Sequence, residues 1–562
     1  MFFRIAPRRQ GDVTYRYLQL VESYREGGRN RQRVLFSLGN VETLRSDGQL
    51  GRLVASLERA AGVAPRPAVG LQTERVLEYG GSRLAQALWE QFGLTELLRE
   101  LLAGRRCRFD VIAAVAAMVF NRLLAPKSEL ALFAWRDRLW WPTFAEAPLE
   151  LAHFYAALDV LLSVKEPLEE ALFARLKDLF NLEVDLVFYD LTSTYFEGEG
   201  PALAAYGYSR DKRPDRRQVL VALACDRHGF PIAHEVLAGQ RADVTTVQEM
   251  VAALSARFRL RRVIFVADRG MVSADNLAAL TEAGYEYVVG MPRRRVPEVL
   301  TRAPEDRADY EPGPHRVGLH TTPGETPGTR YVCCYSEARA QEERQIRAAR
   351  IRRGEQALTK LAAQVAAGRL KRKEKIAARV ATALRQAHAT SYFTCVVGEA
   401  DLTFARKEAR IATEERLVGR YFLLTNADAL PPSEAVEAYF TLQEVERAFR
   451  EMKDFLKLRP IYHWTDRRVR AHIFVCVLAY LLERSLTHQL RAGGLELSAR
   501  TALDWASHIH AVENRFAETT IWTVSRPPPV ASQVLNAVGL RTLPTVLQGP
   551  DLPGPNSDVP GL

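Results

Sequence analysis

The sequence lacks any apolar run long enough to cross a membrane. Its apolar runs Val111–Phe120 and Ile473–Leu482 have ten residues each, whereas a membrane-spanning helix needs about 20. The N-terminal stretch carries Arg4, Arg8 and Arg9 but no apolar segment followed by a small-residue cleavage site, so we expect no secretory signal. These absences predict a protein that stays in the cytoplasm and has no membrane partner.

Cysteine is scarce as well, with six residues in 562. None of them belongs to a Cys-x-x-Cys pair or to a regular Cys/His spacing, so the sequence indicates neither a zinc module nor a disulfide framework. We expect reduced and mostly buried thiols, at Cys107, Cys225, Cys333, Cys334, Cys395 and Cys476.

The composition is typical of a globular protein with several domains. Hydrophobic residues make up 47% of the chain and charged residues 26%, which excludes wholesale disorder, collagen and low-complexity fibres. The length of 562 residues exceeds the roughly 250–300 residues that one hydrophobic core supports. We therefore expect more than one domain, and we find no internal repeat.

Positive charge is concentrated in one stretch. The chain has 77 Lys and Arg against 67 Asp and Glu, a net charge of +10. Between Glu342 and Arg385, thirteen Lys and Arg face four Glu, so this stretch alone carries +9. Its helical spacing predicts one or two basic helices, which are either a solvated surface or a polyanion contact. We favour the contact because clustered cations release counterions from phosphate, and we expect it at Arg369, Lys371, Arg372 and Lys373.

Changes in hydrophobic period divide the chain into six segments. Residues 13–38 read as two strands around a Gly27-Gly28 turn, helical spacing follows, and then strands and helices alternate in the order βββαβαβ. That order matches the first five strands of a ribonuclease H-like fold. The expected segments are a small basic β-hairpin module (1–60), a helical N-terminal domain (70–181), a first core part (182–292), an insertion with basic helices (293–418), a second core part with C-terminal helices (419–524) and a Pro-rich loose tail (525–562).

Two aspartates follow apolar strands directly. Asp190 comes after Leu186–Tyr189, and Asp268 comes after Ile264–Ala267. Residues at the carboxyl ends of neighbouring strands meet at one crevice of an open sheet. A single aspartate in this position is usually a turn or capping residue, but two of them make a functional role as well supported as that structural one.

A third carboxylate, Glu446, lies in a segment with a helical pattern. Apolar residues at steps of three and four predict a buried stripe, which consists of Leu442, Val445, Phe449, Met452 and Leu456. Glu446, Arg450 and Lys453 would form a polar line beside that stripe. By itself this line could be an ordinary surface ion pair. Together with Asp190 and Asp268, however, it offers hard oxygen ligands of the kind that Mg²⁺ or Mn²⁺ prefers.

These motifs resemble the DDE transposases of bacterial insertion sequences, in the insertion-sequence-four superfamily with its Tyr-Arg-Glu-Lys signature. The resemblance covers roughly residues 184–482 and rests on Tyr189–Thr194, Val266–Met271 and the helix Tyr439–Lys453. The signature reads Tyr439, Leu442, Glu446, Lys453 here, with the family's spacing but Leu442 in place of Arg. Arg450 or the adjacent Gln443 would then have to supply that phosphate contact.

The resemblance implies an α/β fold with a ribonuclease H-like catalytic core, a mixed sheet flanked by helices, and a large insertion before the catalytic glutamate. It makes Asp190, Asp268 and Glu446 the catalytic, metal-binding triad for two Mg²⁺ or Mn²⁺ ions. Tyr439, Arg450 and Lys453 would contact phosphates of the element's ends. The expected partners are double-stranded DNA, as terminal inverted repeats and as target, and a second copy of the chain in a homodimer. The protein would act in the bacterial cytoplasm, at the nucleoid when bound to DNA.

The function that follows is metal-dependent cleavage at insertion-sequence ends and strand transfer into target DNA. A nuclease of the same fold that cuts without joining is the enzymatic alternative, and a catalytically silent DNA-binding protein is the other. A Ser193 or Thr194 nucleophile is disfavoured because nothing places a general base beside it. His463 and His472 are expected to be packed or solvent-facing rather than metal ligands. Two further segments, Gly207–Asp215 and Arg459–His463, are similar to the family but receive no role.

Overall fold

The computed structural model divides the chain into two compact units. The first combines Met1–Val76 with Val512–Thr523, and the second combines Leu77–Ala511 with Val524–Leu562. The structure describes residues 1–10, 13–62, 71–141, 149–180, 186–241, 250, 257–258, 264–267, 273–291, 304, 309–516 and 519–547.

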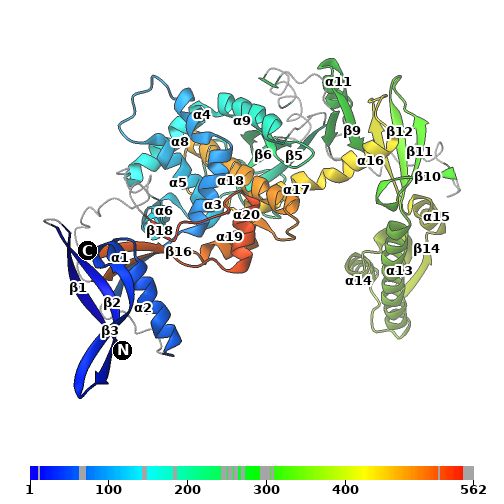
Figure 1. The fold of residues 1–562 in the computed structure, drawn as a ribbon. Coiled ribbons are helices and arrows are strands. Elements are labelled where there is room, and N and C mark those ends of the chain that lie inside the picture. Colours follow the sequence, from blue (N-terminus) through cyan, green and yellow to red (C-terminus); the bar gives the residue numbers. More distant parts are fainter. Residues whose placement is uncertain are drawn as a thin grey trace. The chain divides into compact units, whose positions relative to one another are not determined.

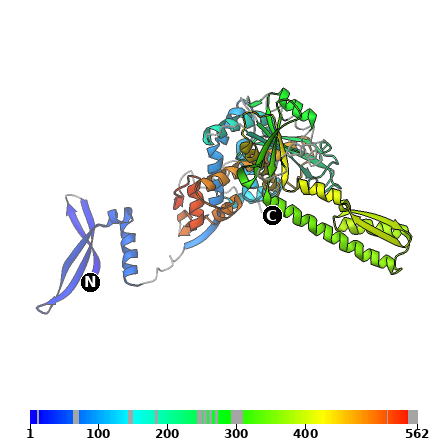
Figure 2. The ribbon, with the colours of Figure 1, turned by 90° about the vertical axis from the view of Figure 1, so that its right-hand side faces the viewer.

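The first unit opens with a three-stranded antiparallel sheet, drawn in blue in Figure 2. Its strands are β1 (Phe2–Gln10), β2 (Val13–Glu26) and β3 (Arg29–Asn40). The predicted glycine turn joins β2 to β3, where Gly27 and Gly28 adopt positive φ angles that favour glycine. The sequence prediction of a hairpin is therefore confirmed, but it missed β1. The remaining elements are α1 (Val41–Ser46), α2 (Gln49–Ala60) and a second sheet with β4 (Leu71–Glu78), β16 (His510–Phe516) and β17 (Thr519–Val524).

The second unit begins with a group of helices packed around one long central helix (Figure 1). The central helix, α18 (Asp466–Ala492), is buried along most of its length because other helices and one β-strand pack against it. Among the described residues, no single helix is long and apolar enough to cross a membrane. The helices around it are α3 (Gly80–Gln91), α4 (Leu94–Leu101), α5 (Val111–Leu124), α6 (Glu129–Trp135), α8 (Leu151–Ser163), α9 (Lys165–Phe180), α19 (Ala499–Ser507) and α20 (Pro529–Ala537).

A mixed nine-stranded sheet forms the other part of this unit. Its order is β10-β11-β12-β15-β9-β8-β5-β6-β7. β5 pairs in parallel with β8, and β8 with β9, whereas β5, β6 and β7 form an antiparallel meander. The strands that the sequence predicted are β5 (Leu186–Tyr195), β6 (Gln218–Cys225), β7 (Pro231–Ala238), β8 (Ile264–Ala267) and β9 (Glu286–Gly290), with α11 (Ala274–Glu282) before β9.

The segment expected as one insertion divides between two structures. Three of its strands extend the sheet: β12 (Arg330–Tyr335), β11 (Gly318–Pro323) and β10 (Glu311–Pro312). They join it through β15 (Arg420–Thr425), the first strand of the expected second core part, which lies between β12 and β9. The rest has its own hydrophobic core, which includes Leu358, Ile376 and Tyr392. It contains α13 (Glu337–Ala366), α14 (Lys373–Gln386), β13 (Phe393–Gly398), β14 (Asp401–Arg406) and α15 (Glu408–Leu417).

The helical segment before α18 is broken into three pieces. α16 (Pro432–Thr441) and α17 (Gln443–Arg450) are separated by Leu442, and a π-helical turn, Glu451–Phe455, follows α17. The single helix expected over Tyr439–Lys453 is therefore interrupted. The expectation of a loose tail from residue 525 was wrong for its first part, since α20 begins at Pro529, a residue type that helices accept in their first turn, whereas residues 548–562 lie outside the described residues. Short elements complete the described fold: 3₁₀ turns at Arg136–Arg138, Pro314–Arg316 and Thr390–Tyr392, and β18 (Val546–Leu547).

Candidate catalytic site

The sequence had suggested that Asp190 ends its strand. In the structure Asp190 lies inside β5. β5 continues to Tyr195 because its second half pairs with β6, with Asp190 opposite Leu223. The parallel pairing with β8 ends earlier, at Phe188 and Val266. Asp190 is half-buried and lies two residues beyond the last of the described pairs with β8.

The two faces of β5 have different surroundings. Val187, Tyr189 and Leu191 point into the hydrophobic core of the sheet. Because side chains alternate along a strand, Asp190 and Thr192 point to the opposite face. Asp268 follows β8 directly in the sequence but lies outside the described residues.

Glu446 is brought to β5 by the packing of α17. Val445 and Phe449 are buried as predicted, and α17 contacts β5 and β6. Glu444 anchors the helix through an ion pair with Arg484 of α18, in which Glu444 Oε2 lies 2.8 Å from Arg484 Nη2. Glu446 itself is exposed, so its carboxylate is available to solvent and ligands.

Lys453 leaves the polar line that the sequence predicted. Glu446 and Arg450 are exposed on α17, but the π-helical turn, with five residues rather than four between bonded groups, redirects Lys453 towards β5. Its ammonium lies 2.6 Å from Thr192 Oγ1 and 2.9 Å from Asp211 Oδ1. Burial lowers the pKa of Lys453, while the hydrogen bond to Asp211 acts in the opposite direction. Thr192 and Asp190 lie on the same face of β5. Lys453 therefore brings a positive charge to the face on which Asp190 lies.

The two segments without a predicted role meet at this ammonium. Asp211, from the first segment, also binds Arg459 from the second, with 2.7 Å between Asp211 Oδ2 and Arg459 Nη1. The Arg459 guanidinium lies 4.9 Å from the ring centroid of Tyr195, the last residue of β5, and Arg213 lies 5.2 Å from the same centroid. The contacts of Arg459 were not predicted from the sequence, because Tyr195 and Asp211 both lie more than two hundred residues before it.

The other predicted DNA-contacting residues lie in three different settings. Tyr439 of α16 is half-buried and stacks on Tyr421 of β15, with 6.4 Å between ring centroids. Leu442, at the signature position where the family has Arg, is 5% exposed and belongs to the core. The four basic residues at the insertion are exposed in the turn between α13 and α14 and at the first residue of α14: Arg369, Lys371, Arg372 and Lys373.

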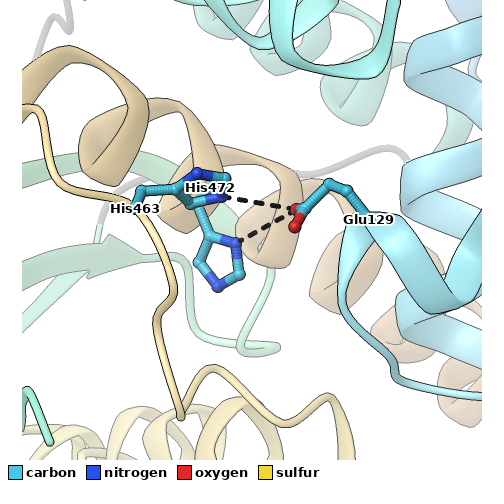
Figure 3. Close-up of side chains that lie close together, drawn as sticks. All are labelled: Glu129, His463 and His472. Atoms are coloured by element: carbon cyan, nitrogen blue, oxygen red, sulfur yellow. Dashed lines mark ion pairs between the residues drawn. The ribbon is translucent and has the colours of Figure 1, made fainter. Parts of the chain in front are cut away.

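A second polar cluster lies among the helices (Figure 3). It consists of Glu129, His463 and His472, all buried, whose ligand atoms lie within 4.8 Å of one another. Glu129 Oε1 is 3.4 Å from His463 Nε2 and 3.8 Å from His472 Nδ1. Burial alone would raise the pKa of Glu129, but its contact with His463 is the largest opposing influence, and the pKa lies well below its usual range.

Arg122 lies next to this cluster and contacts His472. His472 Nε2 lies 3.2 Å from the Leu458 carbonyl oxygen, which can only accept, so this nitrogen carries the proton. The lone pair of His472 Nδ1 then faces Arg122 Nη2 at 3.5 Å. Burial and Arg122 lower the pKa of His472 to about 4, so the ring is neutral at pH 7. A metal ion would need the lone pair of His472 Nδ1, which already faces the Arg122 cation. The cluster is therefore a polar network that connects α5 and α6 with α18.

Comparisons with known proteins give two family models that match this chain. A family model described as "Transposase DDE domain" matches residues 185–482. Another, described as "IS1634 family transposase, N-terminal domain", matches residues 3–67. A search of curated proteins finds no match. Matching solved structures include a "Mos1 transposase paired-end complex with left transposon end", which is 15% identical, covers 37% of this chain and 77% of that chain, and has a TM-score of 0.14.

Proposed function

The chain belongs to the DDE transposases, with an N-terminal domain of the IS1634 family, and from this premise we propose that it cuts DNA at the ends of an insertion sequence and joins those ends to target DNA. The observation that carries the proposal is the placement of α17 against β5, which brings the helix of Glu446 to the strand of Asp190. Asp268 follows in sequence the strand that pairs with β5.

The donor set fits a hard divalent cation. Asp190, Asp268 and Glu446 offer only carboxylate oxygens, which suit Mg²⁺ or Mn²⁺ better than zinc. When bound, two such ions activate water or a 3′-hydroxyl and stabilise the leaving oxygen of an in-line displacement. In this proposal the three carboxylates hold the ions, and the half-buried setting of Asp190 keeps its charge directed at one face of β5.

Cationic and aromatic residues around this face would hold the DNA. Lys453 lies beside the Asp190 face through its bond to Thr192, so it would bind a phosphate near the cut. Tyr439 and the exposed Arg450 would contact phosphates further along the element's end. The exposed turn between α13 and α14, with its cluster of four cations, would bind the backbone of a longer duplex through counterion release.

A cleavage assay on DNA that carries the element's own ends tests the proposal. With Mg²⁺ or Mn²⁺, wild type should nick at the ends, and EDTA should prevent it. Glu446→Gln and Asp190→Asn should each lower cleavage by at least about a hundredfold, since each removes a charged ligand of the ions. Their DNA binding, measured by fluorescence anisotropy without metal, should stay within a few-fold of wild type.

Glu434→Gln is the matched control, because Glu434 is an exposed glutamate in the first turn of α16, and it should cleave as wild type does. Joined products would select the transposase over the nuclease of the same fold. Intact binding with no cleavage by wild type would contradict the proposal and favour a silent DNA-binding protein.

A further inference from the structure

The Tyr-Arg-Glu-Lys signature has Leu442 in place of its arginine in this chain. The structure shows that this side chain is buried, so position 442 cannot supply the phosphate contact expected of the arginine. Leu442 is buried between α16 and α17. Arg450, the replacement that the sequence suggested, lies on the exposed side of α17, whereas Lys453 turns towards β5 through the π-helical segment. A guanidinium beside Lys453 must therefore come from elsewhere in the chain.

Arg459 is placed to provide it. Asp211 uses one carboxylate oxygen for Lys453 Nζ, at 2.9 Å, and the other for Arg459 Nη1, at 2.7 Å. Two cations thus share one carboxylate and lie side by side. The side chain of Asp211 is 7% exposed and that of Lys453 is 12% exposed, but that of Arg459 is 27% exposed. Arg459 is accordingly the member of the group that reaches furthest into solvent.

The group formed by Asp211, Lys453 and Arg459 has more positive charge and more N–H donors than its internal contacts use. Lys453 and Arg459 carry two charges against the single charge of Asp211, and Arg210 adds a further positive field at Lys453. An ammonium has three donors and a guanidinium five, of which Thr192 and Asp211 engage only some. Tyr195 supports the guanidinium plane from one side. A phosphodiester, with one negative charge and two free oxygens, would complete this arrangement.

We propose that Arg459 and Lys453 together bind one phosphodiester of the DNA strand that enters the Asp190 face, and that Asp211 is the positioning residue that holds the two cations side by side. This inference rests on the proposed function, because it takes the Asp190 face as the place of cleavage. It gives roles to Gly207–Asp215 and Arg459–His463, the two segments that the sequence left without one.

The first test measures DNA binding as a function of salt. Arg459→Ala should weaken binding of end DNA roughly five- to tenfold and lower the slope of log K against log salt concentration by about 0.9, the loss expected for one phosphate contact. Arg459→Lys keeps the charge without the planar fork, so it should restore the salt slope but not the full affinity. Arg500→Ala is the matched control, since its guanidinium also stacks on an aromatic ring, that of Phe455 at 4.8 Å, and it should change neither quantity.

The second test separates positioning from binding. Asp211→Asn removes a negative charge, so it should leave the affinity for DNA equal or higher, while the single-turnover rate of end cleavage falls by at least about tenfold because Lys453 and Arg459 are no longer held together. Asp211→Glu keeps the charge and should recover part of the rate. A purely structural role would instead lower the melting temperature and the affinity together.

The outcomes distinguish this inference from the proposed function. If wild type cleaves its end DNA while Arg459→Ala keeps the wild-type affinity, salt slope and rate, the inference is overturned and the proposed function stands. If wild type neither binds nor cleaves end DNA, both are overturned.

Discussion

At the scale of single residues, one buried carboxylate outside the proposed triad has three close partners with basic side chains. Glu169 of α9 is 2.7 Å from His234 Nδ1, 3.3 Å from Lys165 Nζ and 2.6 Å from Arg257 Nη2. Burial alone would raise its pKa, but these neighbours, His234 foremost, lower the pKa of Glu169 to about 2. The cluster fixes α9 to β7, the edge strand of the sheet.

Glu169→Gln should therefore destabilise the fold, by about 3–5 kcal/mol, because it leaves Lys165 and Arg257 without their shared buried partner. Since the folded-state pKa lies below the usual value of 4.5, the stabilisation is complete above pH 4.5 and is lost as the pH falls towards 2. Burial also lowers the pKa of His234, so protonation of that ring during acidification acts in the same direction. Urea denaturation across this range should show a weaker pH dependence in the variant.

Glu170→Gln provides the control for this prediction. Glu170 lies next to Glu169 and pairs with the same Arg257, at 3.3 Å, but its side chain is 43% exposed. Its replacement should cost less than about 1 kcal/mol. Equal losses for the two variants would show that burial of Glu169 does not govern the stability of this contact.

At the scale of elements, what the sequence predicted depended on local pattern. The meander and the two parallel strands follow from apolar runs and the Asp226–Gly229 turn, all within short stretches. The strands β10–β12 were assigned to an insertion because their partner, β15, comes about a hundred residues later. Pairing over such distances leaves no trace in the local period.

In the helix that carries Glu446, too, local sequence pattern predicted some features and missed those that depend on distant residues. Its buried stripe was predicted correctly from spacing alone, since Val445, Phe449 and Met452 are all buried. The π-helical turn was not, because nothing in the residues Glu451–Phe455 marks it. The rotation that it gives to Lys453 depends on Thr192 and Asp211, which lie on other elements. The carboxylates of the proposed site were thus predicted from the sequence alone, while the neighbours of Lys453 became visible only in the tertiary structure.

The turn between α13 and α14 carries an element-scale prediction. Its four cations are exposed, whereas Leu370 between them is buried in the hydrophobic core of this segment. Replacing Arg369, Lys371, Arg372 and Lys373 together by Gln should weaken binding to duplex DNA and lower the salt slope by up to about four units, at roughly 0.9 per phosphate contact. The stability of the fold should not change, because the core of this segment lies at Leu358, Ile376 and Tyr392. An unchanged slope would make the turn an ordinary solvated surface.

At the scale of the whole molecule, the number of DNA ends predicts that the proposed chemistry involves more than one chain. Each chain carries one set of Asp190, Asp268 and Glu446, whereas an element has two ends that must be cut and joined to one target. A symmetric pair, the commonest assembly of soluble proteins, would supply one carboxylate set to each end. The homodimer thus stays a proposal that follows from the number of ends.

Mixing active and inactive chains tests this directly. If two chains act on two ends, an equimolar mixture of wild type and Glu446→Gln on DNA with both ends should give about half of its assemblies with one active site, as random pairing requires. Products cut at a single end should then reach their maximum near equal amounts of the two proteins. Mixing wild type with Glu434→Gln should leave double-end products dominant at every ratio. A yield of double-end products that falls only in proportion to the wild-type fraction, with no rise of single-end products, would show that one chain processes both ends in turn.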